Sequence, residues 1–217
     1  MRIDHVLLAS RNIDDSAGRL HSRYGLCSVR GGEHPQWGTA NRIVPLGSQY
    51  LEIIGVTDPA RAEQSALGRW VAASAGKGDA LAGFMVEPND FDATCDRLSL
   101  TQVPGERTLA DGTTLSWRLA GLGEAITQGL PCFIAWDGRS GLDGLDRLDE
   151  HPPPDDTGIA WLEVGGDAAA LRHWLGGTVD GLRPVDGPPG VRRVALRANS
   201  ETIVLGEHPG MSGGELR

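Results

Sequence analysis

The segment IDHVLLA, residues 3–9, is a short apolar run with one polar interruption on each face, which is typical of a buried strand. Apolar side chains then recur at helical spacing over residues 12–24, behind Asn12 as a candidate N-cap and ahead of Gly25 as a candidate terminating glycine. Three further short strands are expected at residues 26–30, 39–46 and 50–56. The segment at 31–35 (GGEHP) is expected to break the first of these, and Gly47-Ser48 gives the last two the turn chemistry of a hairpin. Residues 1–58 therefore predict a strand, a helix and three strands, a βαβββ module.

The same order of elements returns in residues 81–137. Strands are expected at 82–87, 107–110, 114–119 and 132–136, with a helix from Pro88 through Ser99. An Ala-rich helical linker at 59–80 joins the two modules. A Pro-, Gly- and Asp-rich connection at 138–157 leads to a third, shorter βαββ-like module at 158–208, and residues 209–217 are expected to be a frayed tail. The sequence thus predicts an α+β fold of tandem βαβββ modules with a third partial module.

The bulk properties restrict the class of partner. The chain has 217 residues and a formal net charge of −9, which disfavours nucleic acid and anionic membrane surfaces as partners, because both need basic faces. No stretch approaches the roughly 18 apolar residues of a membrane helix, and the N-terminus has no pattern of a signal peptide. The cysteine count of three is odd and no CxxC pair is present, which predicts unpaired thiols in a reducing compartment. A cytoplasmic protein with a small-molecule ligand is the expectation, and a homodimer is compatible with it.

Three motifs occur in order in the first module: IDHV at residues 3–6, HPQWGTAN at 34–41 and YLEII at 50–54. Together they resemble the glyoxalase-like domain branch of the vicinal oxygen chelate superfamily. This resemblance implies paired modules whose strands curl around one cleft, with His5 and Glu52 as ligands of one divalent cation, for which Zn, Mn, Fe, Ni and Co all remain open. It also implies that Glu52, or a metal-bound water, acts as a base in a lyase, isomerase or dioxygenase.

The second module departs from that pattern. Its expected first strand, AGFMV at 82–86, has no His or Gln, and its last, CFIAW at 132–136, has no Glu. The chain therefore offers two ligands where three or four are usual, although Glu87 and Asp137 lie just beyond these strands. A buried pair of His5 and Glu52 would also satisfy both groups without a metal. One divalent cation and no cation at all both remain open.

We expect His5 and Glu52 to face the same cleft. Side chains alternate along a strand, so His5 should share a face with Ile3 and Leu7, and Glu52 with Tyr50 and Ile54. In the resembled fold both of these faces are concave. The two side chains should then be close enough to share a ligand or a hydrogen bond.

Other residues are candidates for ligand binding. Asn41 could orient a substrate carbonyl or be a polar residue of an edge strand, and His34 could cover the cleft mouth from a loop or be solvated. Trp37 and Phe133, with Trp117 and Trp136, could form an apolar wall or ordinary core. Two functions follow as hypotheses: a metal-dependent enzyme, or a protein that binds a small molecule without chemistry, for sequestration or sensing.

Overall fold

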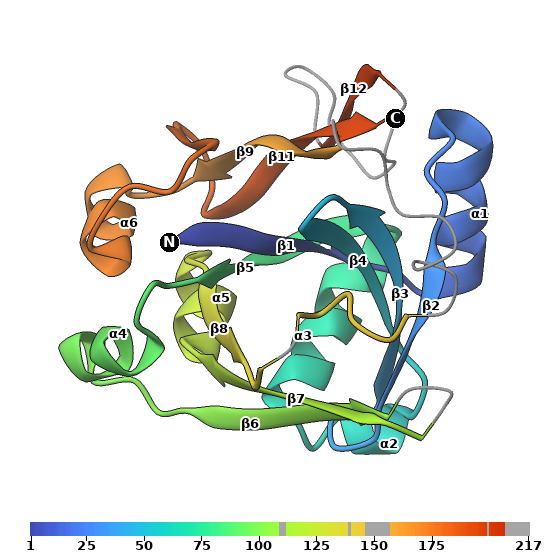
Figure 1. Ribbon diagram of the computed structural model, residues 1–217, viewed down its shortest axis with the longest axis horizontal. Helices are drawn as coiled ribbons and strands as arrows, with labels where there is room; N and C mark the ends of the chain where they lie inside the picture. The colour runs from blue at the N-terminus through green and yellow to red at the C-terminus, as the bar shows by residue number, and fades with distance from the viewer. Residues whose placement is uncertain (109–111, 139, 146–156, 199, 207–217) are drawn as a thin grey trace.

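Eight strands from the two predicted modules close into one barrel (Figure 1). The computed structural model describes residues 1–108, 112–138, 140–145, 157–198 and 200–206. The strands of the first module are β1 (Arg2–Ala9), β2 (Val29–His34), β3 (Thr39–Leu46) and β4 (Gln49–Val56). Those of the second are β5 (Ala80–Glu87), β6 (Val103–Thr108), β7 (Thr114–Ala120) and β8 (Cys132–Trp136). Around the barrel the order is β1-β4-β3-β2-β6-β7-β8-β5, so each module contributes one contiguous half.

Local sequence signals explain where the first helix begins and ends. Helix α1 (Ile13–Tyr24) follows Asn12, whose side chain accepts hydrogen bonds from the backbone N–H groups of Asp14 and Asp15. Gly25 ends the helix in the left-handed conformation, at φ 68°, which glycine adopts without steric cost. The predicted N-cap and terminating glycine are both confirmed.

The two modules meet along two unequal seams. Strands β1 and β5 pair antiparallel at seven positions, from Arg2 opposite Glu87 to Ala9 opposite Ala80. On the other side, among the described residues, β2 and β6 pair only through Glu33 and Thr108. In the described part of the chain, one seam is therefore a long ladder with two register shifts and the other a single pair.

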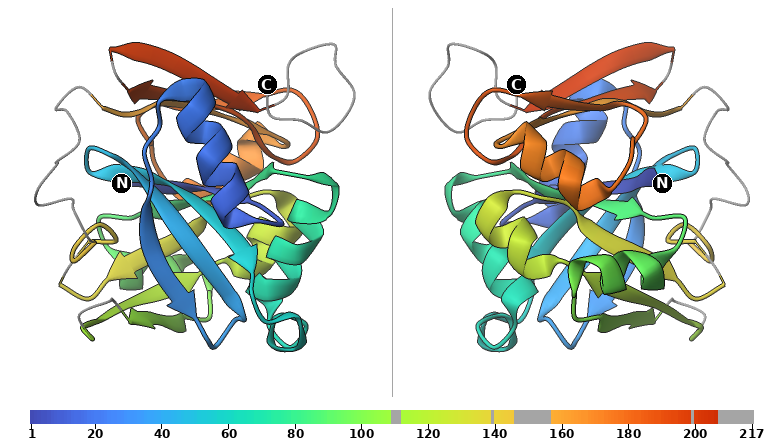
Figure 2. Two further views of the ribbon diagram at one scale, coloured as in Figure 1. Left: turned by 90° about the vertical axis from the view of Figure 1, so that its right-hand side faces the viewer. Right: turned by 90° about the vertical axis from the view of Figure 1, so that its left-hand side faces the viewer.

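The third unit forms a separate sheet that covers one side of the barrel (Figure 2). It contains β9 (Gly158–Gly165), α6 (Ala168–Leu175), β10 (Leu182–Val185), β11 (Gly190–Ala198) and β12 (Glu201–Gly206). Its strand order is β10-β9-β11-β12, so its pairing differs from that of the two barrel modules. The strand β10 was not expected from the sequence, because its proline and exposed residues lack the pattern of a buried strand.

The remaining helices cover the outside and one end of the barrel. They are α2 (Pro59–Ala62), α3 (Ala66–Ser74), the 3₁₀ turn η1 (Ala75–Lys77), α4 (Phe91–Leu98) and α5 (Leu122–Gln128). The helical linker is thus present as two short helices, with Leu67 of α3 reaching the barrel interior. Helix α5 interrupts the second module between β7 and β8 and was not predicted.

Two large apolar cores result, beside a small third cluster of Ile43, Tyr50, Leu115 and Leu145. The larger lies between the outer face of the barrel and the third sheet, and includes Val6, Phe84, Phe133 and Val194. The smaller fills the barrel interior with residues such as Leu7, Met85, Trp117 and Ile134. Alternation along β1, β5 and β8 sends neighbouring residues to opposite cores.

Some sequence predictions differ from the structure. The strand expected at 26–30 lies at 29–34, because Gly31 and Gly32 continue the strand instead of breaking it. Strand β6 begins at Val103, ahead of the expected 107. Several other predicted segments lie outside the described residues: the strand end at 109–110, the turn residue 111, most of the connection at 138–157 and the tail at 209–217.

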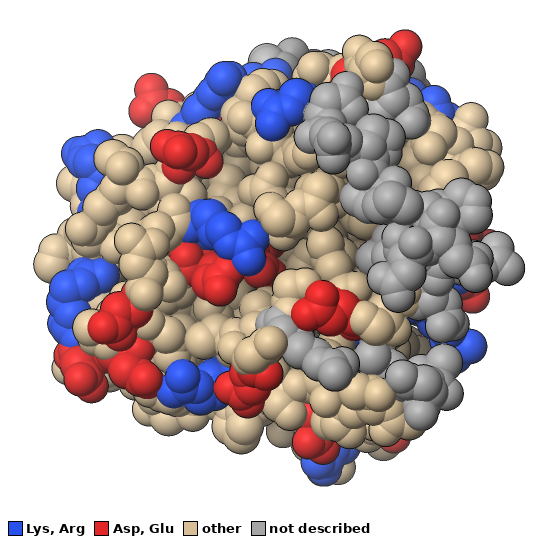
Figure 3. Space-filling model, in the orientation of Figure 1, with Lys and Arg blue, Asp and Glu red and all other residues tan. Residues whose placement is uncertain are grey.

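The three thiols follow the sequence expectation. Cys27, Cys95 and Cys132 are all unpaired. On the face shown in Figure 3, Lys and Arg side chains lie beside Asp and Glu and do not gather into a basic patch. No helix among the described residues has both the length and the apolar character needed to cross a bilayer.

Candidate ligand-binding site

A bulge in β1 turns Asp4 and His5 together into the barrel. The pairing of β1 with β5 slips between Ile3 and His5, so that Asp4 is an extra residue in the ladder. Such a bulge interrupts the alternation of faces. Leu7 lines the interior with His5 as expected, but Ile3 packs in the outer core, which corrects the predicted face for that residue.

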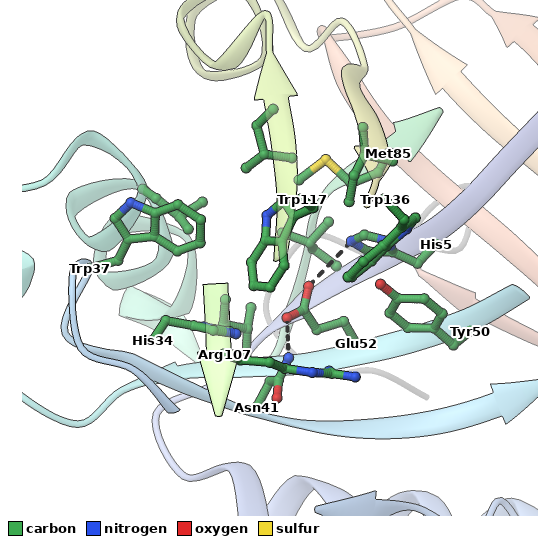
Figure 4. Close-up of a pocket in the computed structure, with 15 residues that line it drawn as sticks. His5, His34, Trp37, Asn41, Tyr50, Glu52, Met85, Arg107, Trp117 and Trp136 are labelled. Carbon is green, nitrogen blue, oxygen red and sulfur yellow. Dashed lines mark hydrogen bonds and ion pairs between the residues drawn. The ribbon is translucent and has the colours of Figure 1, made fainter. Parts of the chain in front are cut away.

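His5 lies between the carboxylates of Asp4 and Glu52, and Figure 4 shows its contact with Glu52. Its Nδ1 is 2.5 Å from Asp4 Oδ1, and its Nε2 is 3.4 Å from Glu52 Oε2. The ring of Tyr50 stacks on the imidazole with centroids 4.3 Å apart. Glu52 shares its face with Tyr50 and Ile54, as the alternation predicted. The structure thus brings His5 and Glu52 together inside the barrel.

The electrostatics of this pair are set by burial and by mutual attraction. Burial alone would lower the pKa of His5, but the hydrogen bonds and charges of Asp4 and Glu52 outweigh it and raise the pKa to about 9. Burial would raise the pKa of Glu52, but His5, with help from His34 and Asn41, lowers it to about 2. At neutral pH the pair is therefore an imidazolium beside a carboxylate.

Asn41 and His34 complete the polar part of the site. Asn41, at 3% exposure on the central strand β3, donates from Nδ2 to Glu52 Oε1 over 2.5 Å. Its Oδ1 lies against Gly31, where an added Cβ would clash with it, so the glycine makes room for the amide. His34 is buried at the end of β2, not in a loop, with Nδ1 3.0 Å from Thr39 Oγ1. Burial lowers the pKa of His34 to about 4, so this second imidazole is neutral.

Aromatic side chains form the walls. Trp37 lines the cavity and contacts Trp117, with ring centroids 6.0 Å apart, and Trp117 in turn contacts Trp136 at 5.1 Å. Phe133 does not belong to this wall. It points from β8 to the outer face and stacks on Trp174, because Cys132, Ile134 and Trp136 occupy the inward positions of that strand.

Arg107 is a residue of the site that sequence reasoning missed. It points inward from β6, is 2% exposed, and lines the cavity beside Glu52 and Tyr50 (Figure 4). The period-two alternation of β6, with Gly105 and Arg107 buried and Pro104 and Glu106 exposed, is the signal that could have found it. The cavity volume left among these side chains is about 30 Å³, above the roughly 10–15 Å³ that one water molecule needs.

The donor set does not fit the cation that the resemblance implies. The inward residues of the second module near His5 and Glu52 are Met85, Ile134 and Trp136, a thioether, an alkyl group and an indole. Among the described residues, no group of three or more His, Cys, Asp or Glu side chains could hold a metal ion. Both nitrogens of His5 are engaged by carboxylates, and Glu52 Oε1 accepts from Asn41. Divalent ions such as Zn, Mn, Fe, Ni and Co prefer three or more nitrogen and oxygen ligands, and the residues of this site do not supply them.

The aromatic wall depends on Gly105. A Cβ built on this residue would clash with the indole of Trp117 and lie 2.8 Å from Trp37. We expect Gly105→Ala to lower the free energy of unfolding by about 1–3 kcal/mol through overpacking, measured by urea denaturation. Gly123→Ala is the matched control, since no atom lies within 4 Å of that Cβ position. Equal stability of the two variants would contradict the tight packing of the wall.

Comparisons with known proteins agree with this fold. A family model described as "Glyoxalase-like domain" matches residues 3–179. The crystal structure of a hypothetical protein from Staphylococcus aureus is similar at 15% identity, over 94% of this chain and 84% of that chain, with a TM-score of 0.63. A search among curated proteins gives no match.

Methylmalonyl-CoA epimerase from Mycobacterium tuberculosis is similar at 17% identity, over 62% of this chain and 86% of that chain, with a TM-score of 0.44. A methylmalonyl-CoA epimerase in complex with methylmalonyl-CoA and NH4+ gives 19% identity, 62% and 92% coverage and a TM-score of 0.45. These two likenesses carry no functional argument. The match over residues 3–179, which is more than half of the chain, establishes the family: the chain belongs to the glyoxalase-like domain family.

Proposed function

We propose that the barrel interior binds a small organic molecule. On this proposal the chain is a small-molecule binding protein of glyoxalase-like fold. One observation carries this proposal: a cavity with aromatic walls ends in a cluster of convergent polar groups, His5, Asn41, Glu52 and Arg107. Mostly apolar concave sites with a few placed polar groups are the usual form of small-molecule sites. The aromatic walls favour a ligand with an aromatic or branched apolar part.

The electrostatics favour binding over proton abstraction. An efficient general base has a pKa near the working pH. The pKa of Glu52 is about 2, because His5 stabilises its charged form, so its carboxylate is a weak base. The pKa of His5 is about 9, so its imidazole keeps its proton.

The test is ligand-dependent stabilisation and fluorescence. A ligand at about 100 times its Kd adds about 2.7 kcal/mol to the free energy of unfolding, and thermal denaturation with a panel of small aromatic and branched acids, amides and alcohols should find such compounds. Their binding should quench tryptophan emission. The Trp117→Phe variant should lose part of this quenching, whereas Trp161→Phe, which lies on β9 outside the cavity, should keep it. No stabilisation by any member of the panel would contradict the proposal.

A second candidate is proton transfer on the bound molecule, as in an isomerase or lyase. The chain of Asp4, His5 and Glu52 favours it, because Asp4 orients an imidazole whose other nitrogen pairs with the Glu52 carboxylate in the cavity. It predicts exchange of C–H protons of 2-oxo acids in D₂O, followed by NMR, that is absent from Glu52→Gln. Metal content of the purified protein, measured without added metal, decides whether a cation takes part, and the donor set predicts less than one ion per chain.

A further inference from the structure

Among the described residues, no acidic side chain neutralises the positive charge of Arg107 by direct contact. Its residue is 2% exposed, and its Nε has no hydrogen-bond partner among the described residues. A buried guanidinium normally has an ion-pair partner and satisfied donors, since an unpaired buried charge is costly. The described part of the chain therefore supplies no acceptor for Nε of this buried side chain.

The nearby carboxylates are already used. Glu52 accepts from Asn41 and pairs with His5, and Asp4 pairs with His5 and accepts from Trp136 Nε1 over 3.2 Å. Among the described residues, no carboxylate lies within ion-pair distance of Arg107. The negative charge of the cavity floor is thus directed at His5 and not at the guanidinium.

A single backbone oxygen stands in for the missing acceptor. Nη2 of Arg107 donates to the carbonyl oxygen of Gly141 over 2.5 Å. Gly141 lies against Tyr50 and Trp136, where an added Cβ would be 2.7 Å from Tyr50 Oη. The turn that carries it is held by its own bonds, with Asp143 accepting from the backbone N–H of Ser140 over 2.7 Å. A neutral carbonyl of a separate turn therefore covers the cationic end of the cavity.

We propose that Arg107 recognises the carboxylate of a small organic acid with an aromatic or branched apolar body, and that this carboxylate takes the place of the Gly141 carbonyl. The inference rests on the proposed small-molecule binding and adds the chemical class of the ligand. A carboxylate supplies two coplanar oxygens, which match the adjacent N–H groups of a guanidinium. Because the acid takes the place of the Gly141 carbonyl at Nη2 of Arg107, its binding displaces the turn at 140–145.

The body of the acid is accommodated by the groups next to Arg107. Tyr50, Trp117 and Trp136 give flat apolar surfaces within the same cavity. Leu142 and Leu145 of the displaced turn pack on Ile43, Tyr50 and Leu115, so an apolar ligand replaces contacts of the same kind. A ligand without an apolar part would leave this surface uncovered.

Pairs of acids and amides of the same shape test the charge recognition directly. We would measure by calorimetry the binding of benzoate and benzamide, isobutyrate and isobutyramide, and acetate and acetamide. The wild-type protein should bind at least one acid about tenfold or more tightly than its amide, because a hydrogen bond to a charged partner is worth at least that factor. Arg107→Met should remove this preference while amide binding persists. Arg107→Lys keeps the charge without the two-donor geometry and should give an intermediate preference.

Arg30→Met is the matched control, because Arg30 lies on the neighbouring strand β2 with its side chain 80% exposed. It should bind every compound like the wild type. Equal binding of acids and amides by the wild-type protein, or an unchanged preference in Arg107→Met, would overturn the role of Arg107 and leave the proposed function standing. Binding of neither acids nor amides would overturn both. The wild-type comparison alone decides the inference if a variant fails to fold.

Discussion

Replacing Glu52 with alanine is expected to lower the free energy of unfolding by about 3–5 kcal/mol, the usual cost of removing one partner of a buried ion pair. The substitution leaves the His5 imidazolium with Asp4 alone and takes the acceptor from Asn41 Nδ2. For a chain of this size each kcal/mol lowers Tm by about 2–4 °C, so a thermal melt at pH 6.5 should show a fall of roughly 6–20 °C.

The control for this effect is Glu106→Ala, on β6, whose side chain is exposed. It should change Tm by no more than about 2 °C, because surface substitutions usually stay within about 0.5 kcal/mol. Glu52→Gln should fall between the two, since an amide oxygen still accepts from Asn41. A Glu52→Ala protein as stable as the Glu106→Ala protein would show that the pair is not held in the buried arrangement.

Stability should pass through a maximum near pH 6.5, because the two buried histidines respond to pH in opposite ways. The pKa of His5 is about 9 in the folded protein, above the usual 6.5, so its contribution is complete below pH 6.5 and is lost as the pH rises through 9. The pKa of His34 is about 4 in the folded protein, below the usual 6.5. As the pH falls from 6.5 to 4, the unfolded chain therefore takes up a proton that the folded protein does not, and the free energy of unfolding falls. Each limb amounts to about 3 kcal/mol.

Glu52 does not change the position of this maximum, because its pKa in the folded protein is about 2. Its contribution to the free energy of unfolding is complete above about pH 4.5 and is lost only as the pH falls through 2. Urea denaturation between pH 4 and 9 measures both limbs. His34→Gln should flatten the acid limb and keep the alkaline limb, whereas His173→Gln, at an exposed position of α6, should keep both. An acid limb that survives in His34→Gln would contradict the assignment.

The sequence predicts the modules well because their signals are local. Asn12 and Gly25 mark the ends of α1, and the alternation of Tyr50, Glu52 and Ile54 predicts which side of β4 faces inward. Helix α5 and strand β10 escaped prediction because they are short and only partly buried, so their apolar pattern is weak. Tertiary contacts stabilise such elements more than their own propensity does.

The site was predictable only where it follows strict alternation. The resemblance singles out His5 and Glu52, and alternation predicts only that they face the same cleft. The bulge at Asp4 depends on pairing with β5, 76 residues or more along the chain, and no local pattern indicates it. The same bulge places Asp4 beside His5 and so sets the charge of the imidazole. Phe133 shows the converse error, in which an aromatic residue one position from the inward face was assigned to the wrong side of β8.

The unequal seams of the barrel have a consequence for its fluctuations. Strands β1 and β5 pair at seven positions, whereas β2 and β6 pair at one among the described residues. The two half-barrels are therefore joined more strongly along the β1–β5 seam. Side chains also bridge the β2–β6 seam, through the contact of Trp37 with Trp117 and the hydrogen bond from Gln36 Nε2 to the Glu106 carbonyl. Local opening starts where the ladder is shortest. Amide protons of β2 and β6 should therefore exchange with solvent orders of magnitude faster than those of β1. The β1–β5 ladder should open only when the whole molecule unfolds.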